Sequence, residues 1–183
     1  MPIQIGQKRE SDFSDPLGLL SDCHRRIEHF LAVLIRVCDG TKGGSLDPEQ
    51  RVALEKALAY FRDAAPKHTA DEEESLFPRL HATVFDQPDS LMTSLVCLEQ
   101  EHEVAARDHQ VVDELGLRWL NEGALAGRDS QALSEALARL NELYSLHIEI
   151  EDRELFPLAA RLLGPDELAA VGREMAGRRG IKK

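Results

Sequence analysis

Apolar side chains recur at steps of three and four residues in four long stretches of this chain, and no other feature constrains the fold as strongly. The stretches cover residues 16–38, 48–82, 90–121 and 130–163. Side chains at such steps line one face of an α-helix, and the stretches are rich in Leu, Ala, Glu and Arg, which favour helices. We find no alternation of apolar and polar residues typical of a strand. The chain is therefore predicted to be all-α.

Turn-forming residues interrupt this pattern at residues 39–44, 85–90, 122–130 and 164–165. Because the connections between the long helices are short, neighbouring helices are expected to run antiparallel. Their apolar faces would then meet in the centre of an up-down-up-down four-helix bundle that covers residues 16–163.

The two ends of the chain are expected to lie outside this bundle. Residues 1–15 are mostly polar and are predicted to form a flexible N-terminal tail. Residues 164–183 are predicted to form a short helix over residues 166–176 and a basic tail. The basic side chains at this end, too few to indicate a nucleic-acid surface, are Arg173, Arg178, Arg179, Lys182 and Lys183.

The charge of the chain argues against two classes of partner. Its 183 residues include 33 Asp and Glu but only 22 Lys and Arg, which gives a net charge of −11. Nucleic acids and anionic membranes attract basic surfaces, so neither is expected to bind. No apolar stretch is long enough to cross a membrane, and the first residues do not resemble a signal peptide. Cys23, Cys38 and Cys97 show no C-x-x-C spacing, which favours a reducing, cytoplasmic location.

Six polar residues occupy positions in the apolar faces where leucines would be expected. An ionised carboxylate in an apolar core is costly unless a cation or hydrogen bonds compensate for it. No Lys or Arg stands beside the two glutamates in these faces, so the pattern predicts a pair of divalent metal ions. The six residues are His24, His68, Glu72, His102, His147 and Glu151.

The same residues form an internal repeat. Residues 68–78 and 147–157 both read H-x3-E-x3-L-F-P, and a lone histidine, His24 or His102, precedes each motif by 44 or 45 residues. Side chains four residues apart lie on one face of a helix, so each motif presents a nitrogen and a carboxylate to the same place. Two helical hairpins related by an approximate two-fold axis are therefore predicted, with their polar residues at one level of the bundle.

This pattern resembles that of the hemerythrin-like (HHE cation-binding) family, over residues 16–163 and again over the Arg-rich end at 175–181. The six positions agree with the family in residue type, spacing and repeat. The pattern is also similar to the di-iron domain of the RIC-type iron–sulfur cluster repair proteins. The Cys-bearing domain that precedes it in those proteins is not present in this sequence, so the resemblance does not carry their repair role with it.

The resemblance implies a non-haem di-iron centre in a hemerythrin-like bundle. The histidines of the set would be terminal ligands, and Glu72 and Glu151 would bridge the two irons, with an oxo bridge as a further option. Manganese or zinc could substitute for iron in such a ligand set. The resemblance implies these ligands for the metal: His24, His68, Glu72, His102, His147 and Glu151.

Two departures from the oxygen-carrying hemerythrins bear on activity. Those proteins place a further histidine one turn after the ligand of the third helix, where this chain has Ala106, and they use a longer spacing than that between His147 and Glu151. Each metal would then keep open positions for water, dioxygen, nitric oxide or peroxide. Redox or sensing chemistry is therefore expected rather than reversible dioxygen carriage.

Several residues near the six have two interpretations. Tyr144 is either a core aromatic with a bonded hydroxyl or a hydrogen-bond donor to a ligand of the metal, and no catalytic residue is assigned. Glu28 is either a solvated carboxylate or a third carboxylate ligand. His109 lies about 10 Å along the helix axis from His102, beyond reach of the same centre, and is interpreted as a core histidine.

The remaining polar and proline residues receive structural interpretations. Cys23 and Cys97 are expected to be buried free thiols. The acidic neighbours of the ligands are expected to face solvent: Asp71, Glu73, Glu74, Glu101 and Glu103. The prolines are expected to kink their helices: Pro66, Pro78 and Pro157.

The sequence therefore favours a cytoplasmic di-iron protein that binds dioxygen, nitric oxide or peroxide, or handles iron, in stress response or sensing. The first alternative is a di-iron oxidoreductase or peroxidase. The second is a structural zinc site or an iron-sensing interaction domain. The expected partners are a small diatomic or peroxide ligand and a redox or iron-accepting protein.

Overall fold

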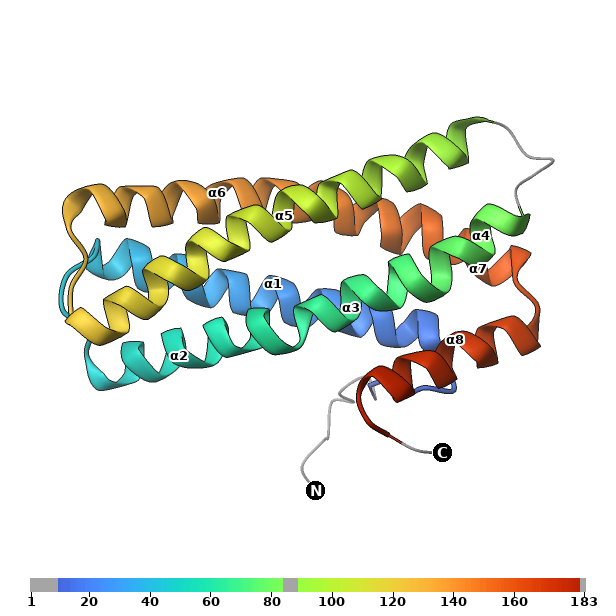
Figure 1. Ribbon diagram of the computed structural model, residues 1–183, viewed down its shortest axis with the longest axis horizontal. Coiled ribbons are helices and arrows are strands. Elements are labelled where there is room, and N and C mark those ends of the chain that lie inside the picture. Colours follow the sequence, from blue (N-terminus) through green and yellow to red (C-terminus); the bar gives the residue numbers. More distant parts are fainter. Residues whose placement is uncertain (1–9, 84–88, 182–183) are drawn as a thin grey trace, which may run out of the picture.

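Four long helical rods, three of them running nearly the length of the molecule, make up the body of the protein (Figure 1). The computed structural model describes residues 10–83 and 89–181, the side chains of residues 89–92 excepted, and this part of the chain contains no strand. The elements are α1 (Pro16–Thr41), α2 (Pro48–Asp63), α3 (Ala65–Asp71), η1 (Glu72–Leu76), α4 (Phe77–Thr83), α5 (Asp89–Glu122), α6 (Gly127–Ile150), η3 (Glu151–Leu155), α7 (Phe156–Leu162) and α8 (Pro165–Arg178).

These elements confirm the predicted all-α bundle. α2, α3, η1 and α4 follow one another as one interrupted rod, and α6, η3 and α7 form another, so four rods result with the order that the sequence predicts. The first helix continues to Thr41 rather than ending at residue 38. Most of the predicted break at residues 85–90 lies outside the described residues.

Local sequence explains where the second rod begins. Asp47 accepts a hydrogen bond from the backbone N–H of Gln50, and the Gln50 side chain accepts one from the backbone N–H of Asp47. This capping box satisfies two donors at the start of α2, and Pro48 supplies the preset φ of a first helical residue.

The prolines of the repeat produce wide helical turns rather than simple kinks. In η1 and η3 the backbone N–H groups of Phe77 and Phe156 donate to the carbonyl oxygens of Glu72 and Glu151, five residues back, as in a π-helix. Pro78 and Pro157 follow directly. A proline lacks the N–H for the usual bond and its ring would strike the carbonyl four residues back, and one wide turn relieves both problems.

The third proline marks an interruption of the second rod. α2 ends at Asp63, Ala64 separates it from α3, and Pro66 stands in the first turn of α3, where a missing N–H is tolerated.

Two apolar clusters divide the interior of the bundle. One lies toward the loop at residues 42–47 and contains Trp119, which is fully buried. The other lies toward the opposite end and contains Phe77 and Phe156. Along α1, Leu20 belongs to the second cluster and Ile27 to the first, with His24 between them. The level of the bundle that holds His24 and the other five predicted ligands, called the polar layer below, therefore lies between the two apolar clusters.

The C-terminal helix α8 lies beside α3 and covers part of the second cluster (Figure 1). Of the predicted N-terminal tail, residues 1–9 lie outside the described part, whereas Phe13 packs against this same cluster. The backbone carbonyl of Phe13 approaches α8 at Gly172, where a β-carbon would lie 2.0 Å from the oxygen.

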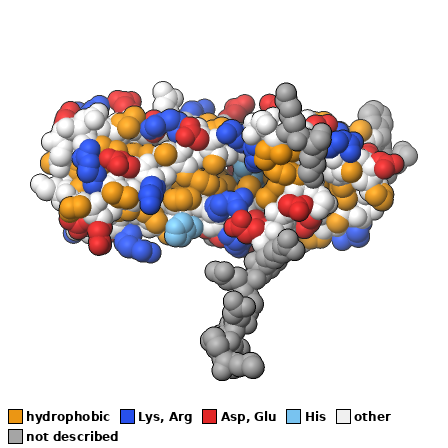
Figure 2. Space-filling view, turned by 90° about the horizontal axis from the view of Figure 1, so that it is seen from below, with side chains coloured by type: hydrophobic (Ala, Val, Ile, Leu, Met, Phe, Trp, Pro, Cys, Tyr) orange, Lys and Arg blue, Asp and Glu red, His pale blue; other side chains and the backbone are white. Residues whose placement is uncertain are grey.

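Charged side chains of both signs cover the visible surface. Figure 2 shows acidic and basic side chains interspersed over one face of the molecule, with apolar side chains between them. Among the described helices, none combines the length and apolar character that a membrane span requires.

We expect Gly172→Ala to lower the free energy of unfolding by about 1–3 kcal/mol, because its methyl group would displace the backbone at Phe13. Gly177→Ala on the same helix is the matched control, since no atom lies within 4 Å of its β-carbon position. That control should be neutral or stabilising by up to about 1 kcal/mol, because Ala favours helix over Gly. Urea denaturation of the two variants measures the difference, and equal stabilities would contradict this account.

Candidate metal centre

The six residues predicted as ligands lie together in the polar layer. His24 comes from α1, His102 from α5, and the two His-x3-Glu pairs come from the junctions of α3 with η1 and of α6 with η3. All six are buried, and both glutamates are fully inaccessible. The step of three and four residues that places leucines in the core therefore places these polar groups there as well.

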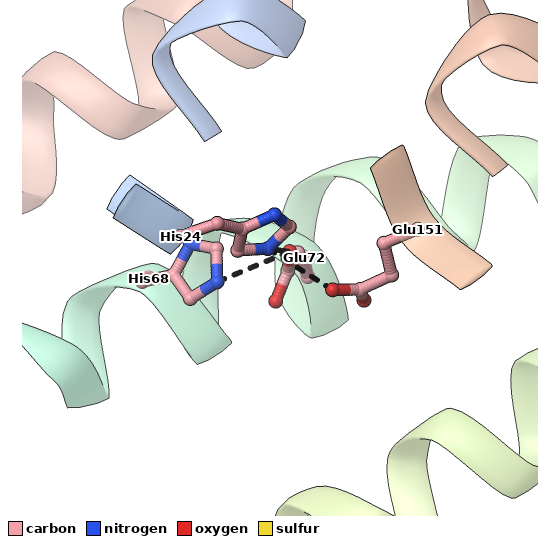
Figure 3. Close-up of side chains that lie close together, drawn as sticks. All are labelled: His24, His68, Glu72 and Glu151. Carbon is pink, nitrogen blue, oxygen red and sulfur yellow. Dashed lines mark ion pairs between the residues drawn. The ribbon is translucent and has the colours of Figure 1, made fainter. Parts of the chain in front are cut away.

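The ligand atoms form two clusters that share one carboxylate. His24, His68, Glu72 and Glu151 make the first, with one atom from each lying within 4.8 Å of the others (Figure 3). The second combines Glu151 with His102 and His147.

Both glutamates reach histidines of the two hairpins. Oε2 of Glu151 lies 3.1 Å from Nε2 of His24 and 3.2 Å from Nε2 of His147. Glu72 places Oε1 3.4 Å from Nε2 of His68 and Oε2 3.5 Å from Nε2 of His102. Each carboxylate thus lies between histidines of both hairpins.

Three of the four histidines are held from behind by carboxylates. Nδ1 of His24 lies 2.9 Å from Asp152, Nδ1 of His102 lies 2.9 Å from Glu73, and Nδ1 of His147 lies 2.8 Å from Glu101. With the proton on Nδ1, each ring donates outward and turns the lone pair of Nε2 into the layer. Such carboxylates orient a histidine ligand and raise its basicity.

These supporting carboxylates correct the expectation that Glu73 and Glu101 only face solvent. Each of the three, Asp152 included, adjoins a predicted ligand in the sequence, and this adjacency was the available signal. Two of the three supports cross between the hairpins. Glu73 follows Glu72 but holds His102. Asp152 follows Glu151 and holds His24 in the same way.

The two-fold repeat is broken at the fourth histidine. Glu101 precedes His102 and holds His147, so the equivalent position before His24 would hold His68. That position is Cys23, whose sulfur instead accepts a hydrogen bond from Arg26. Nδ1 of His68 is buried and has no hydrogen-bond partner among the described residues. The two halves of the centre therefore differ in how firmly their histidines are held.

Strong electrostatic coupling follows from the burial of these groups. Burial opposes a charge on His24, but the nearby carboxylates of Asp152, Glu151 and Glu72 outweigh burial and raise its pKa to about 11. Burial likewise opposes a charge on His147, and Glu151 outweighs it to raise the pKa to about 9. Burial and the nearby Glu151 raise the pKa of Glu72 to about 8. Without a metal ion, protons on the histidines balance the carboxylates, and a bound cation would displace them.

The unpaired atoms of the layer fit a metal ion. Nε2 of His24 and all four carboxylate oxygens of Glu72 and Glu151 are buried without a hydrogen bond among the described residues. Leaving a buried polar group unsatisfied costs about 1–3 kcal/mol, and more when it is charged. Imidazole nitrogens with carboxylate oxygens are ligands suited to iron, manganese and zinc. A cation at this place would satisfy several of these atoms at once.

The neighbouring residues with two interpretations lie outside both clusters. Nε2 of His109 lies 2.8 Å from the hydroxyl of Tyr144, so the two form a hydrogen-bonded pair. Glu28 is exposed and pairs with Arg25 at 3.3 Å. These positions favour a bonded core aromatic for Tyr144 and a solvated carboxylate for Glu28.

Two further expectations are wrong. Cys97 is exposed, whereas Cys23 is buried as expected. Asp71 is fully buried, although it stands in an acidic run that was expected to face solvent. It forms ion pairs with Arg178 and Arg179 at the end of α8, a contact that the local sequence does not indicate.

A cavity of about 270 Å³ extends toward the polar layer. Its walls include the exposed Pro66 and Ala106 and, deeper, His102 and Tyr144. A smaller cavity within the layer shares His102 and Tyr144 with it and is also lined by His24, His68 and His147. The larger cavity therefore reaches one of the candidate ligands, His102.

The fold and the site define a four-helix bundle with a buried histidine–carboxylate centre that could hold metal ions. The chain belongs to the hemerythrin HHE cation-binding domain family, whose model matches residues 15–159. It is also similar to an uncharacterized protein of Haemophilus influenzae, with 28% identity over 171 residues, which cover 93% of this chain and 94% of that protein.

We expect Glu101→Gln to weaken metal binding by about 10- to 100-fold, because an amide supports the imidazole of His147 less well than a carboxylate. Glu103→Gln is the matched control, since Glu103 is exposed and lies outside the clusters. Competition with a chelator measures both affinities. If the two variants bind metal equally well, Glu101 does not support the centre.

Proposed function

We propose that this protein holds two iron ions in the polar layer and binds a small ligand there, either dioxygen, nitric oxide or peroxide, in a cytoplasmic stress or sensing response. Iron in such a site supplies open coordination positions and can change its oxidation state. The observation that carries the proposal is the pair of ligand clusters joined by Glu151, with a cavity that reaches His102.

Different residues would hold the metal ions, exclude water and admit the ligand. Glu72 and Glu151 would bridge the two cations, because each carboxylate reaches histidines of both hairpins. The four histidines would complete the two ligand sets. The apolar clusters above and below the layer exclude bulk water from it. Ligand would arrive along the cavity past Ala106 and Tyr144.

The departure at Ala106 supports ligand binding at this side. A methyl group stands there, and its residue lines the cavity rather than closing it. The cation held by His102 and His147 would therefore be the one that faces incoming ligand. A redox partner or an iron acceptor would complete the proposed role.

The first test is the metal content of protein produced with added iron and kept away from chelators. We expect close to two irons per chain by plasma mass spectrometry, and a large loss in His68→Ala. His109→Ala is the control and should keep its metal, because His109 belongs to neither cluster. Predominantly zinc in the unaltered protein would favour a structural site, and a folded protein without metal would refute the proposal.

The second test addresses the path of the ligand. We expect Ala106→Trp to fill the cavity and slow nitric oxide association severalfold, with the metal content unchanged. Arg107→Trp is the matched control, because Arg107 is exposed and is not among the cavity-lining residues. Stopped-flow spectroscopy of the iron-loaded proteins measures the rates. Equal rates in the two variants would place ligand access elsewhere.

The pair of Tyr144 and His109 favours a second candidate, an oxidoreductase or peroxidase. Tyr144 lines both cavities, and its hydroxyl is hydrogen-bonded to the partly buried His109, an arrangement that could move a proton. If the protein is an enzyme, Tyr144→Phe should slow peroxide turnover while its iron content stays the same. A protein that turns over peroxide no faster than free iron would favour simple ligand binding.

A further inference from the structure

The C-terminal helix is fastened to the turn that carries Glu72. Asp71, the residue before Glu72, is completely buried. Nη1 of Arg178 lies 3.0 Å from its Oδ1, and Nη2 of Arg179 lies 2.7 Å from its Oδ2. Both oxygens of one buried carboxylate are thus held by arginines from the end of α8.

The contact continues into η1. The guanidinium of Arg178 also donates to Glu74 at 3.1 Å and to the hydroxyl of Ser75 at 2.8 Å. One turn further along the rod, Arg79 forms a two-pronged pair with Glu174 of α8, at 2.7 and 3.0 Å. Side chains toward the end of α8 therefore contact the second rod at several points in and beside the wide turn.

The ion pairs of Asp71 are expected to contribute more to stability than ordinary surface ion pairs. Exposed ion pairs contribute little because water screens them. Here Asp71 is fully buried, and the arginine side chains are only 20% and 22% exposed. Removing the arginines would leave a buried carboxylate without partners, which is strongly unfavourable.

The second hairpin has no equivalent contact among the described residues. In the repeat, Asp71 corresponds to Ile150 and Glu74 to Arg153. The turn η3 is held instead by α1, because Asp152 accepts hydrogen bonds from Ser21 and from Arg25. The arginine contacts from α8 thus occur in only one of the two described halves of the centre.

The backbone at Glu72 bears on where its carboxylate lies. Neither of its oxygens has a hydrogen-bond partner among the described residues, and the nearest histidine nitrogens, Nε2 of His68 and Nε2 of His102, lie 3.4 and 3.5 Å away. The π-turn that begins at Glu72 sets where the carboxylate points, and α8 holds that turn. We propose that Arg178 and Arg179 are positioning residues for Glu72, so that docking of α8 and metal binding stabilise each other.

The inference deepens the proposed function and rests on it only through the metal centre. If docking of α8 strengthens metal binding, then metal binding must strengthen the docking of α8 by the same factor. The same coupling can therefore be measured from both ends.

The first experiment uses cobalt(II) as the probe, whose visible spectrum reports the ligand set. The variant Asp71→Asn/Arg178→Gln/Arg179→Gln removes the ion pairs of Asp71 without leaving a buried charge, and Arg173→Gln changes an exposed arginine of the same helix. We expect the triple variant to bind cobalt about 10-fold more weakly, with an altered spectrum and unchanged helix content. Equal affinity and equal spectra for the two variants would overturn the inference.

The second experiment uses the unaltered protein and does not depend on a variant that folds. Amide hydrogen exchange is measured with and without zinc. We expect zinc to slow exchange in α8 more than in α2, which contributes no ligand. Equal protection of the two helices would contradict the coupling.

The outcomes separate this inference from the proposed function. Cobalt and zinc report the geometry of the site without redox chemistry. A protein that shows the coupling but binds no nitric oxide when loaded with iron would retain the inference and lose the proposed function. The reverse result would retain the function and remove the role of Arg178 and Arg179.

Discussion

The rest of the structure depends on two carboxylates buried in the middle of a helix bundle. Glu72 and Glu151 have no access to solvent, and their oxygens lie among four inward-facing imidazoles. Such charges are tolerated in an apolar interior only when cations or protons balance them. Every rod of the bundle contributes a side chain to that balance. Because apolar clusters lie on both sides of the layer, an unpaired polar group there could not be solvated by water.

The approximate two-fold repeat builds the layer, and departures from it make the two halves different. Nδ1 of His147 is held by Glu101, whereas Nδ1 of His68 has no partner among the described residues. In the repeat, Tyr144 corresponds to Ala65, and both line the same cavity. The bulky Tyr144 of one half thus faces the small Ala65 of the other across this cavity, and His102 is the one candidate ligand among the described residues of its wall.

The two π-helical turns begin at the two buried glutamates of the polar layer. The wide turns η1 and η3 begin at Glu72 and Glu151 and are followed by Pro78 and Pro157. A regular α-helix would have placed these glutamates with the same register but would have met the proline rings one turn later. Different neighbours then hold the two turns, since α8 contacts η1 through Asp71 and α1 contacts η3 through Asp152. The fold thus gives two similar motifs separate supports.

The sequence by itself determined the helices, their order and the residues of the polar layer. The period of the apolar residues is a local property, and a histidine or glutamate at a core position is conspicuous because burial without a partner is costly. Only the tertiary structure decided the roles of Asp71, Glu73 and Glu101. A carboxylate on the flank of a helix usually faces water, and whether another helix covers it depends on how the rods pack. That packing, not the local pattern, placed Asp71 against arginines and Glu73 and Glu101 against histidines.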